Sequence, residues 1–170
     1  MQKSSTIVLI GFMGVGKTTV GEVLARKTGR PFTDTDDAIV EAFGGMPIPE
    51  IFRTYGEPAF RKKEREVITS LVEEKEGVLS LGGGAFKQES IRDLCLQKAT
   101  VVYLDMTFER WKERLGDLVD SRPLLQGKSM EEIESFFYER RSLYQDHHIH
   151  TKTDDLSPEE VAEVILRDFR

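Results

Sequence analysis

The stretch from Gly11 to Thr19, GFMGVGKTT, has the residue types and spacing of a phosphate-binding loop. It fits the pattern G-x-x-x-x-G-K-[ST], follows an apolar run and precedes a helical pattern. Backbone N–H groups at the start of a helix, together with the helix dipole, can hold phosphate oxygens. Lys17 would add positive charge at the outer phosphates, and the Thr18 hydroxyl suits Mg²⁺. A glycine-rich turn without a ligand is the alternative, but the agreement of pattern, strand and helix favours a nucleotide site.

Three aspartates follow the second expected strand in the sequence DTDD, at Asp34, Asp36 and Asp37. In an extended segment, Asp34 and Asp36 project to the same side. Near a phosphate site they could hold a metal ion through water, or one of them could meet a substrate hydroxyl. The alternative is an N-cap for a helix that begins near Ala38. Because Asp36 or Asp37 alone could provide that cap, we favour a functional role for Asp34.

Three other patterns resemble functional motifs but have simpler explanations. Asp105 ends the apolar run VVYLD and could be a rival magnesium ligand, although a helix cap from Asp105 or Thr107 explains it equally well. Thr151 to Asp154, TKTD, resembles the guanine-reading motif of GTPases, but the D-x-x-G that should accompany it is replaced by LSLGGG. No matching carboxylate or cysteine completes a metal site around the histidines, which we interpret as strand and surface residues: His147, His148 and His150.

A triple glycine, Gly82 to Gly84, stands at the end of another apolar run. Glycine destabilises regular structure, but it allows a sharp turn or the close approach of a ligand to the main chain. An arginine can bind a carboxylate through two parallel hydrogen bonds, or it can reach a transferring phosphoryl group. Four arginines are candidates for such anion binding: Arg61, Arg122, Arg140 and Arg141. For Arg61 the alternative is an exposed helix face, salt-bridged to Glu64.

The elements that must position these residues alternate between strands and helices. We expect strands at Thr6–Ile10, Pro31–Asp34, Gly77–Leu81, Ala99–Leu104 and His147–Thr151. The strands lack a polar face, which predicts an α/β fold whose parallel sheet is covered on both sides. Ligands bind such sheets at the carboxyl ends of the strands. The residues at these ends are expected to surround one crevice: Gly11, Asp34, Gly82 and Asp105.

The composition limits the classes of function. The 170 residues suffice for a single domain, and the formal net charge of −6 argues against a nucleic-acid partner. The apolar run Ile7–Ile10 is too short for a secretion signal or a membrane span, so we expect a cytoplasmic protein without a membrane partner. The single cysteine, Cys95, excludes an intramolecular disulfide framework and a cysteine-based metal site.

Taken together, these motifs resemble those of the shikimate kinase family over almost the whole chain. The resemblance rests on the order and spacing of GFMGVGKTTVG, DTD at 34–36, IFRTYGEPAFRKKE at 51–64, VLSLGGGA at 78–85, SRPLL at 121–125 and ERRSLY at 139–144. It implies a P-loop three-layer fold with a central five-stranded parallel sheet in one kinase domain. It also implies a helical substrate-binding insert at about 36–62, a mobile lid at about 115–127 and a monomeric enzyme.

The resemblance further implies an activity. The family transfers the γ-phosphoryl group of ATP, with Mg²⁺, to the 3-hydroxyl of shikimate, which gives 3-phosphoshikimate in the chorismate pathway to aromatic amino acids. Lys17, Asp36 and Arg122 would then be catalytic, with Asp36 orienting the hydroxyl. Thr18 and Asp34 would serve the Mg²⁺ site.

The remaining roles implied by the resemblance concern binding. The shikimate side would comprise Asp36, Arg61, Gly82, Gly83, Gly84 and Arg141. The nucleotide side would comprise Gly14, Val15, Gly16, Lys17, Thr18, Thr19, Arg114 and Arg122. The sequence departs from the family near the last helix, where TKTDDLSP offers Lys152 but no arginine to the adenine. Adenine stacking would therefore fall to Arg114 and the local backbone.

Two other functions compete with this interpretation. A kinase of the same fold could act on another small acid or polyol, such as gluconate. The combination of Asp36, Arg61 and Arg141 matches the shikimate pattern better. A non-catalytic nucleotide switch is the second alternative, and it is disfavoured by the missing D-x-x-G and by the candidate catalytic residues.

Overall fold

The structure, a computed structural model, describes residues 6–74, 76–114 and 127–169. Five strands form one sheet: β1 (Ile7–Ile10), β2 (Phe32–Asp34), β3 (Val78–Ser80), β4 (Thr100–Asp105) and β5 (Ile149–Lys152). The helices between and after them are α1 (Lys17–Thr28), α2 (Thr35–Ala42), α3 (Ile48–Tyr55), α4 (Glu57–Glu73), α5 (Glu89–Lys98), α6 (Phe108–Lys112), α8 (Met130–Arg141) and α9 (Pro158–Phe169). Two short 3₁₀ turns, Ala85–Lys87 and Ser142–Tyr144, precede α5 and follow α8.

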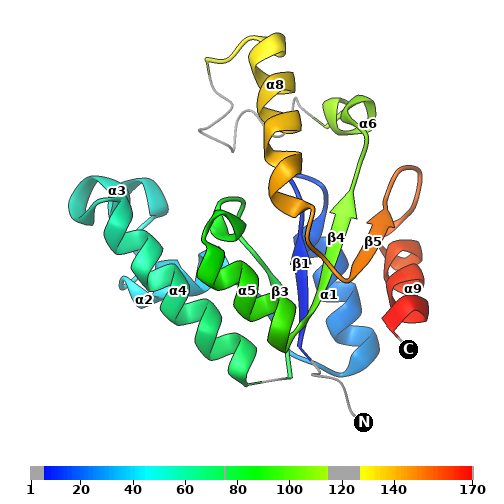
Figure 1. The fold of residues 1–170 in the computed structure, drawn as a ribbon, viewed down its shortest axis with the longest axis horizontal. Helices are drawn as coiled ribbons and strands as arrows, with labels where there is room; N and C mark the ends of the chain where they lie inside the picture. Colours follow the sequence, from blue (N-terminus) through cyan, green and yellow to red (C-terminus); the bar gives the residue numbers. More distant parts are fainter. Residues whose placement is uncertain (1–5, 75, 115–126, 170) are drawn as a thin grey trace.

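The sheet has the strand order β2-β3-β1-β4-β5, and every neighbouring pair is parallel (Figure 1). β1 lies in the centre, where Leu9 is in register with Ser80 on one side and Val102 on the other. The five-stranded parallel sheet expected from the sequence is therefore confirmed. The last strand begins two residues later than expected, at Ile149, and just before it the His148 ring accepts the amide of Val101 on β4.

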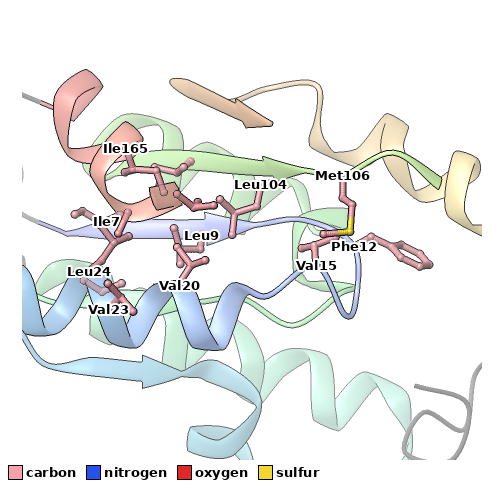
Figure 2. Packing of buried hydrophobic residues seen from close by; sticks show 14 of the residues in the cluster. Ile7, Leu9, Phe12, Val15, Val20, Val23, Leu24, Leu104, Met106 and Ile165 are labelled. Atoms are coloured by element: carbon pink, nitrogen blue, oxygen red, sulfur yellow. The ribbon is translucent and has the colours of Figure 1, made fainter. Parts of the chain in front are cut away.

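Helices cover both faces of the sheet. On one face, Ile7 and Leu9 of β1 pack with Leu24 of α1 and Ile165 of α9, as Figure 2 shows. On the other face, the alternate β1 residues Val8 and Ile10 pack in a second core with side chains of α4 and α5. The strict alternation along a strand buried on both sides explains why its sequence lacks a polar face.

The segment between β2 and β3 has a small core of its own. Ile39 of α2, Ile51 of α3 and Phe60 of α4 form this cluster, away from both faces of the sheet. Gly56 separates α3 from α4 with a φ of 87°, a backbone conformation that favours glycine. This segment therefore consists of separate helices, α2, α3 and α4. Within the described residues, no helix is long and apolar enough to cross a membrane.

The strand ends meet closely at their carboxyl edge. Gly11 follows β1 with a φ of 153°, and a Cβ there would lie 2.7 Å from the carbonyl oxygen of Leu104 on β4. Only glycine therefore allows the chain to leave β1 alongside β4 at this point. The lid expected at 115–127 falls almost entirely, with Arg122, outside the described residues.

Candidate active site

The loop after β1 presents backbone donors to the carboxyl edge of the sheet. Gly14 and Gly16 have φ values of 81° and 99°, and Gly16 caps α1 without any side-chain hydrogen bond. The start of α1 thus has no side-chain cap, and backbone amides at such a helix start are the donors that a phosphate site uses. Lys17 Nζ donates to the carbonyl oxygens of Gly11 at 2.7 Å and Phe12 at 3.3 Å, so its charge lies over the loop. The loop expected from the sequence has the geometry of an anion site.

Two residues, one in α6 and one just after it, donate hydrogen bonds to the main chain of this loop. The buried indole of Trp111 donates from Nε1 to the carbonyl oxygen of Met13 at 2.7 Å. Arg114 donates from its guanidinium to the carbonyl oxygen of Gly14 at 2.9 Å. Arg114 therefore lies beside the phosphate loop, and its contact with adenine stays a prediction.

Asp34 serves two purposes at the end of β2. Its Oδ1 accepts the amides of Asp36 at 2.9 Å and Asp37 at 3.4 Å, which makes Asp34 the N-cap of α2. Its Oδ2 accepts the Thr18 hydroxyl at 3.2 Å. The alternative considered from the sequence, a cap by Asp36 or Asp37 for a helix beginning near Ala38, does not hold, because the helix starts three residues earlier and Asp34 itself is the cap. One carboxylate oxygen of Asp34 nevertheless meets the phosphate loop beside the proposed magnesium ligand Thr18.

Asp36 lies where the first turn of α2 meets the glycine-rich segment after β3. A Cβ on Gly82 would collide with its Oδ1. Desolvation raises the pKa of Asp36 to about 6, and the negative charges of Asp34 and Glu64 add to this effect. The positive charges of Lys17 and Arg61 act in the opposite direction. Asp36 is thus placed between the phosphate loop and Arg61, with a carboxylate that ionises close to neutral pH.

Arg61 is held by carboxylates on α4. Its guanidinium lies 2.9 Å from Glu64 Oε1 and 3.4 Å from Glu57 Oε1. The Glu64 side chain is 1% exposed and also accepts from Gln88 at 2.7 Å. A buried carboxylate with two donors is fixed in position, so Arg61 is oriented toward the glycine segment rather than toward solvent.

The triple glycine has a different use at each of its positions. Gly82 leaves room for Asp36, and Gly84 leaves room for Arg61, whose Nη2 would lie 2.8 Å from a Cβ there. Only Gly83 of the three has open space where a Cβ would stand. Glycine at Gly82 and Gly84 therefore leaves room for the protein's own charged side chains, which a Cβ would force to shift. Close approach of a ligand, the use expected from the sequence, concerns Gly83.

These residues line one cavity of about 530 Å³ at the carboxyl edge of the sheet. Its polar side contains Asp36, Arg61, Glu64, Gly82, Gly83, Gly84, Arg140 and Tyr144. Its apolar side contains Phe12, Met13, Val40, Ile48, Pro49, Phe52 and Phe60. A small ligand with one apolar face, hydroxyl groups and a negative charge fits this distribution.

The structure separates the two neighbouring arginines at the end of α8. Arg140 lines the cavity and donates to the carbonyl oxygen of Gly83 at 2.8 Å. Arg141, the residue expected to bind substrate, instead lies 3.1 Å from Asp105 Oδ2 and borders a separate hollow with Tyr103 and Tyr138. Consecutive residues on a helix point about 100° apart, so only one of the two can face the cavity. The structure thus places Arg140, and not Arg141, beside Arg61.

Helical spacing does not separate the two arginines. Arg140 follows the buried Phe137 by three residues and Arg141 follows it by four, and both spacings belong to one helix face. Local spacing therefore favours neither arginine, and only the packing of α8 distinguishes them. The aromatic and aliphatic wall of the cavity was missed because its side chains look like ordinary core residues in the sequence.

The three motif-like patterns have structural partners. Asp105 accepts Arg141, His150 at 2.9 Å and the Tyr103 hydroxyl at 3.2 Å, so its carboxylate is engaged away from the phosphate loop. Asp154 accepts the amide of Thr107 at 3.0 Å, which explains the acidic end of TKTD as a link to α6. Among the described residues, no cluster of three metal-binding side chains occurs.

Comparison with known proteins agrees with this geometry. The family model for shikimate kinase matches residues 13–170. The shikimate kinase of Bacillus subtilis is 48% identical over 169 residues, covering 99% of this chain and 90% of the relative. The structure of shikimate kinase from Acinetobacter baumannii in complex with shikimate superposes with a TM-score of 0.84 at 35% identity, covering 96% of this chain and 91% of that one. The Aquifex aeolicus enzyme gives a TM-score of 0.81 at 36% identity, with 96% and 95% covered.

The phosphate loop, the charged acceptor cavity beside it and the match over nearly the full length agree with one another. The chain therefore belongs to the shikimate kinase family.

Proposed function

We propose that this protein transfers the γ-phosphoryl group of ATP to the 3-hydroxyl of shikimate. The observation that carries the proposal is the convergence of Asp36, Arg61 and Arg140 on one cavity that also includes the phosphate-loop residues Phe12 and Met13. Donor and acceptor can thus meet at one edge of the sheet, and positioning with electrostatic stabilisation is the main contribution a protein makes to phosphoryl transfer.

On the acceptor side, each group of shikimate has a chemical match. Arg61 and Arg140 are the guanidinium groups that would hold the carboxylate, since arginine forks match a carboxylate in geometry. Asp36 would accept a hydrogen bond from the reacting hydroxyl, and Gly83 offers open main chain to a second one. Phe52 and Phe60 would cover the apolar face of the ring. This assignment replaces Arg141 by its neighbour.

On the donor side, the residues fit ATP with Mg²⁺. Mg²⁺ binds proteins through hard oxygen ligands, often one or two carboxylates with waters and substrate phosphates. The Thr18 hydroxyl and Asp34 Oδ2, 3.2 Å apart, are such a pair. They would hold the ion, which would neutralise phosphate charge. Lys17 would place its charge at the transferring group, and the amides that begin α1 would bind the phosphate oxygens.

A coupled assay of ADP release tests the proposal. The purified protein is mixed with ATP and Mg²⁺, with shikimate, with gluconate or without acceptor. We expect ADP release that depends on shikimate alone and disappears when EDTA removes Mg²⁺. A folded protein that binds ATP but releases ADP only with gluconate would refute the choice of acceptor. An Asp37→Asn protein is the matched control, because Asp37 is a neighbouring carboxylate that does not line the cavity.

The pathway, the cytoplasmic location, the monomeric state and the absence of a nucleic-acid partner stay predictions from the sequence. The lid and Arg122 are likewise proposed only on the resemblance. Lys17→Met and Asp36→Asn, treated below, test the catalytic residues that the structure describes.

A further inference from the structure

Thr35 stands between the two segments that form the acceptor side of the cavity. It is the first residue of α2, it is fully buried, and it lies directly before Asp36. Its hydroxyl donates to the carbonyl oxygen of Ser80 at 3.2 Å and accepts the amide of Gly82 at 3.2 Å. One side chain from the β2–α2 junction thus bonds the main chain on both sides of Leu81.

The directions of these two bonds are fixed. A carbonyl oxygen can only accept and an amide can only donate, so the Thr35 hydroxyl must act as donor to Ser80 and acceptor for Gly82. The backbone pairing of β2 with β3 ends at Asp34 and Ser80. Beyond that pair the Thr35 backbone enters α2, and its side chain takes over the donor and acceptor functions of a peptide group. The hydroxyl therefore continues the hydrogen bonding between the β2–α2 junction and the segment after β3 beyond the last paired residues of the strands.

The consequence reaches the groups that would contact substrate. The Gly82 amide bonds Thr35 and its carbonyl accepts the Ala85 amide at 3.1 Å, so Gly82 is held on both sides. Asp36 packs against that same glycine. Next along the chain, the Gly83 carbonyl accepts Arg140 at 2.8 Å. A shift of this segment would therefore disturb Asp36 and Arg140 together.

We propose that Thr35 is a positioning residue for the acceptor side, whose buried hydroxyl keeps Asp36 and the segment Gly82–Gly84 in register. The inference rests on the proposed function, since it concerns the same cavity. It does not involve the phosphate loop, which has supports of its own in Trp111 and Arg114.

Thr35→Val tests this proposal because valine keeps the shape of threonine and lacks the hydroxyl. We expect kcat/KM for shikimate to fall about tenfold, which corresponds to about 1.4 kcal/mol, while KM for ATP stays within about twofold. Thr35→Ser restores the hydroxyl and should return kcat/KM to within about threefold of the wild-type value. Unchanged kcat/KM in Thr35→Val, or a Thr35→Ser protein as impaired as Thr35→Val, would overturn the proposal.

Thr6→Val is the matched control. Thr6 is as buried as Thr35, and its hydroxyl also donates to a distant carbonyl, that of Val72 at 3.4 Å, but it precedes β1 at the opposite edge of the sheet. It should lose stability without a selective change in kcat/KM for shikimate. An equal loss in Thr6→Val would show a general packing effect and would overturn the proposal.

Amide hydrogen exchange in the wild-type protein provides a readout that does not depend on activity or on the folding of Thr35→Val. The Gly82 amide should exchange more slowly than the Gly83 amide. The Gly83 N–H donates no hydrogen bond within the part of the chain that the structure describes. Equal exchange rates would overturn the proposal. A wild-type protein without shikimate-dependent ADP release would instead refute the proposed function, and the exchange measurement would still decide on Thr35.

Discussion

Asp36→Asn should stabilise the folded protein at pH 8 while it abolishes phosphoryl transfer. The pKa of Asp36 is raised to about 6 from 3.8, first because burial disfavours the charged form and then because Asp34 and Glu64 repel it. At about 1.36 kcal/mol for each pH unit, this difference corresponds to about 3 kcal/mol. Because the residue keeps partial contact with solvent, we expect a measured gain of about 1–3 kcal/mol.

The sign of the pH dependence follows from the proton binding of the two states. The folded state has the higher pKa, so it binds the Asp36 proton more tightly than the unfolded state. The resulting stabilisation is fully present below pH 3.8 and is lost as the pH rises through about 6. The advantage of Asp36→Asn should therefore be largest above pH 7 and shrink as the pH falls toward 4.

Urea unfolding at several pH values measures this effect, and the ADP-release assay measures activity beside it. Asp37→Asn is the control: the pKa of Asp37 is also raised, by burial and by Asp34, but the side chain is mostly exposed and lies outside the cavity. An Asp36→Asn protein no more stable than wild type at pH 8 would refute the reasoning that the buried, charged carboxylate of Asp36 destabilises the folded state. Wild-type kcat/KM should fall below about pH 6 as Asp36 becomes protonated.

Three further predictions concern other residues of the site. Lys17→Met should abolish turnover and leave the fold intact, because the charge over the phosphate loop is lost; substantial activity would contradict the loop assignment. Arg140→Gln should raise KM for shikimate about 10- to 100-fold, as expected for loss of a charged hydrogen bond worth about 1.5–3 kcal/mol, whereas Arg141→Gln should change that KM less than threefold; the reverse order would restore the original assignment of Arg141. Gly83→Ala should fold normally and weaken shikimate binding, because its methyl group enters open space, while Gly82→Ala should lower the melting temperature as well, because its Cβ meets Asp36; equal stability of the two would contradict the contact.

Asp34 and Asp36 show which structural features can be predicted from the local sequence and which cannot. The sequence DTDD correctly placed Asp34 at the end of a strand, whereas Asp36, expected in an extended segment, lies in the first turn of α2. It did not show which one caps the helix, since that depends on where α2 begins, and α2 begins at Thr35. The helix start is fixed by the attachment of β2 to β3, which lies more than forty residues away in the chain.

The arginines illustrate the same limit at the other end of the site. Both Arg140 and Arg141 were candidates, and a motif that contains two adjacent arginines cannot distinguish them. The structure separates them because α8 packs with Ile133 and Phe137 toward the core, which turns Arg140 to the cavity and Arg141 to Asp105. The histidine and Asp105 cluster was likewise invisible, because its members come from β4, β5 and the end of α8.

By itself, the sequence determined the phosphate loop, the alternation of buried strands and helices, and the family, because each depends on short-range spacing or on motif order along one chain. The tertiary structure alone decided which charged side chains share the cavity and what a Cβ would meet at each of the three glycines. Gly82 and Gly84 make room for Asp36 and Arg61, which reach them from other elements. Packing fixes such contacts because a buried charge must find its partners and its space within the folded core, wherever those partners lie in the chain.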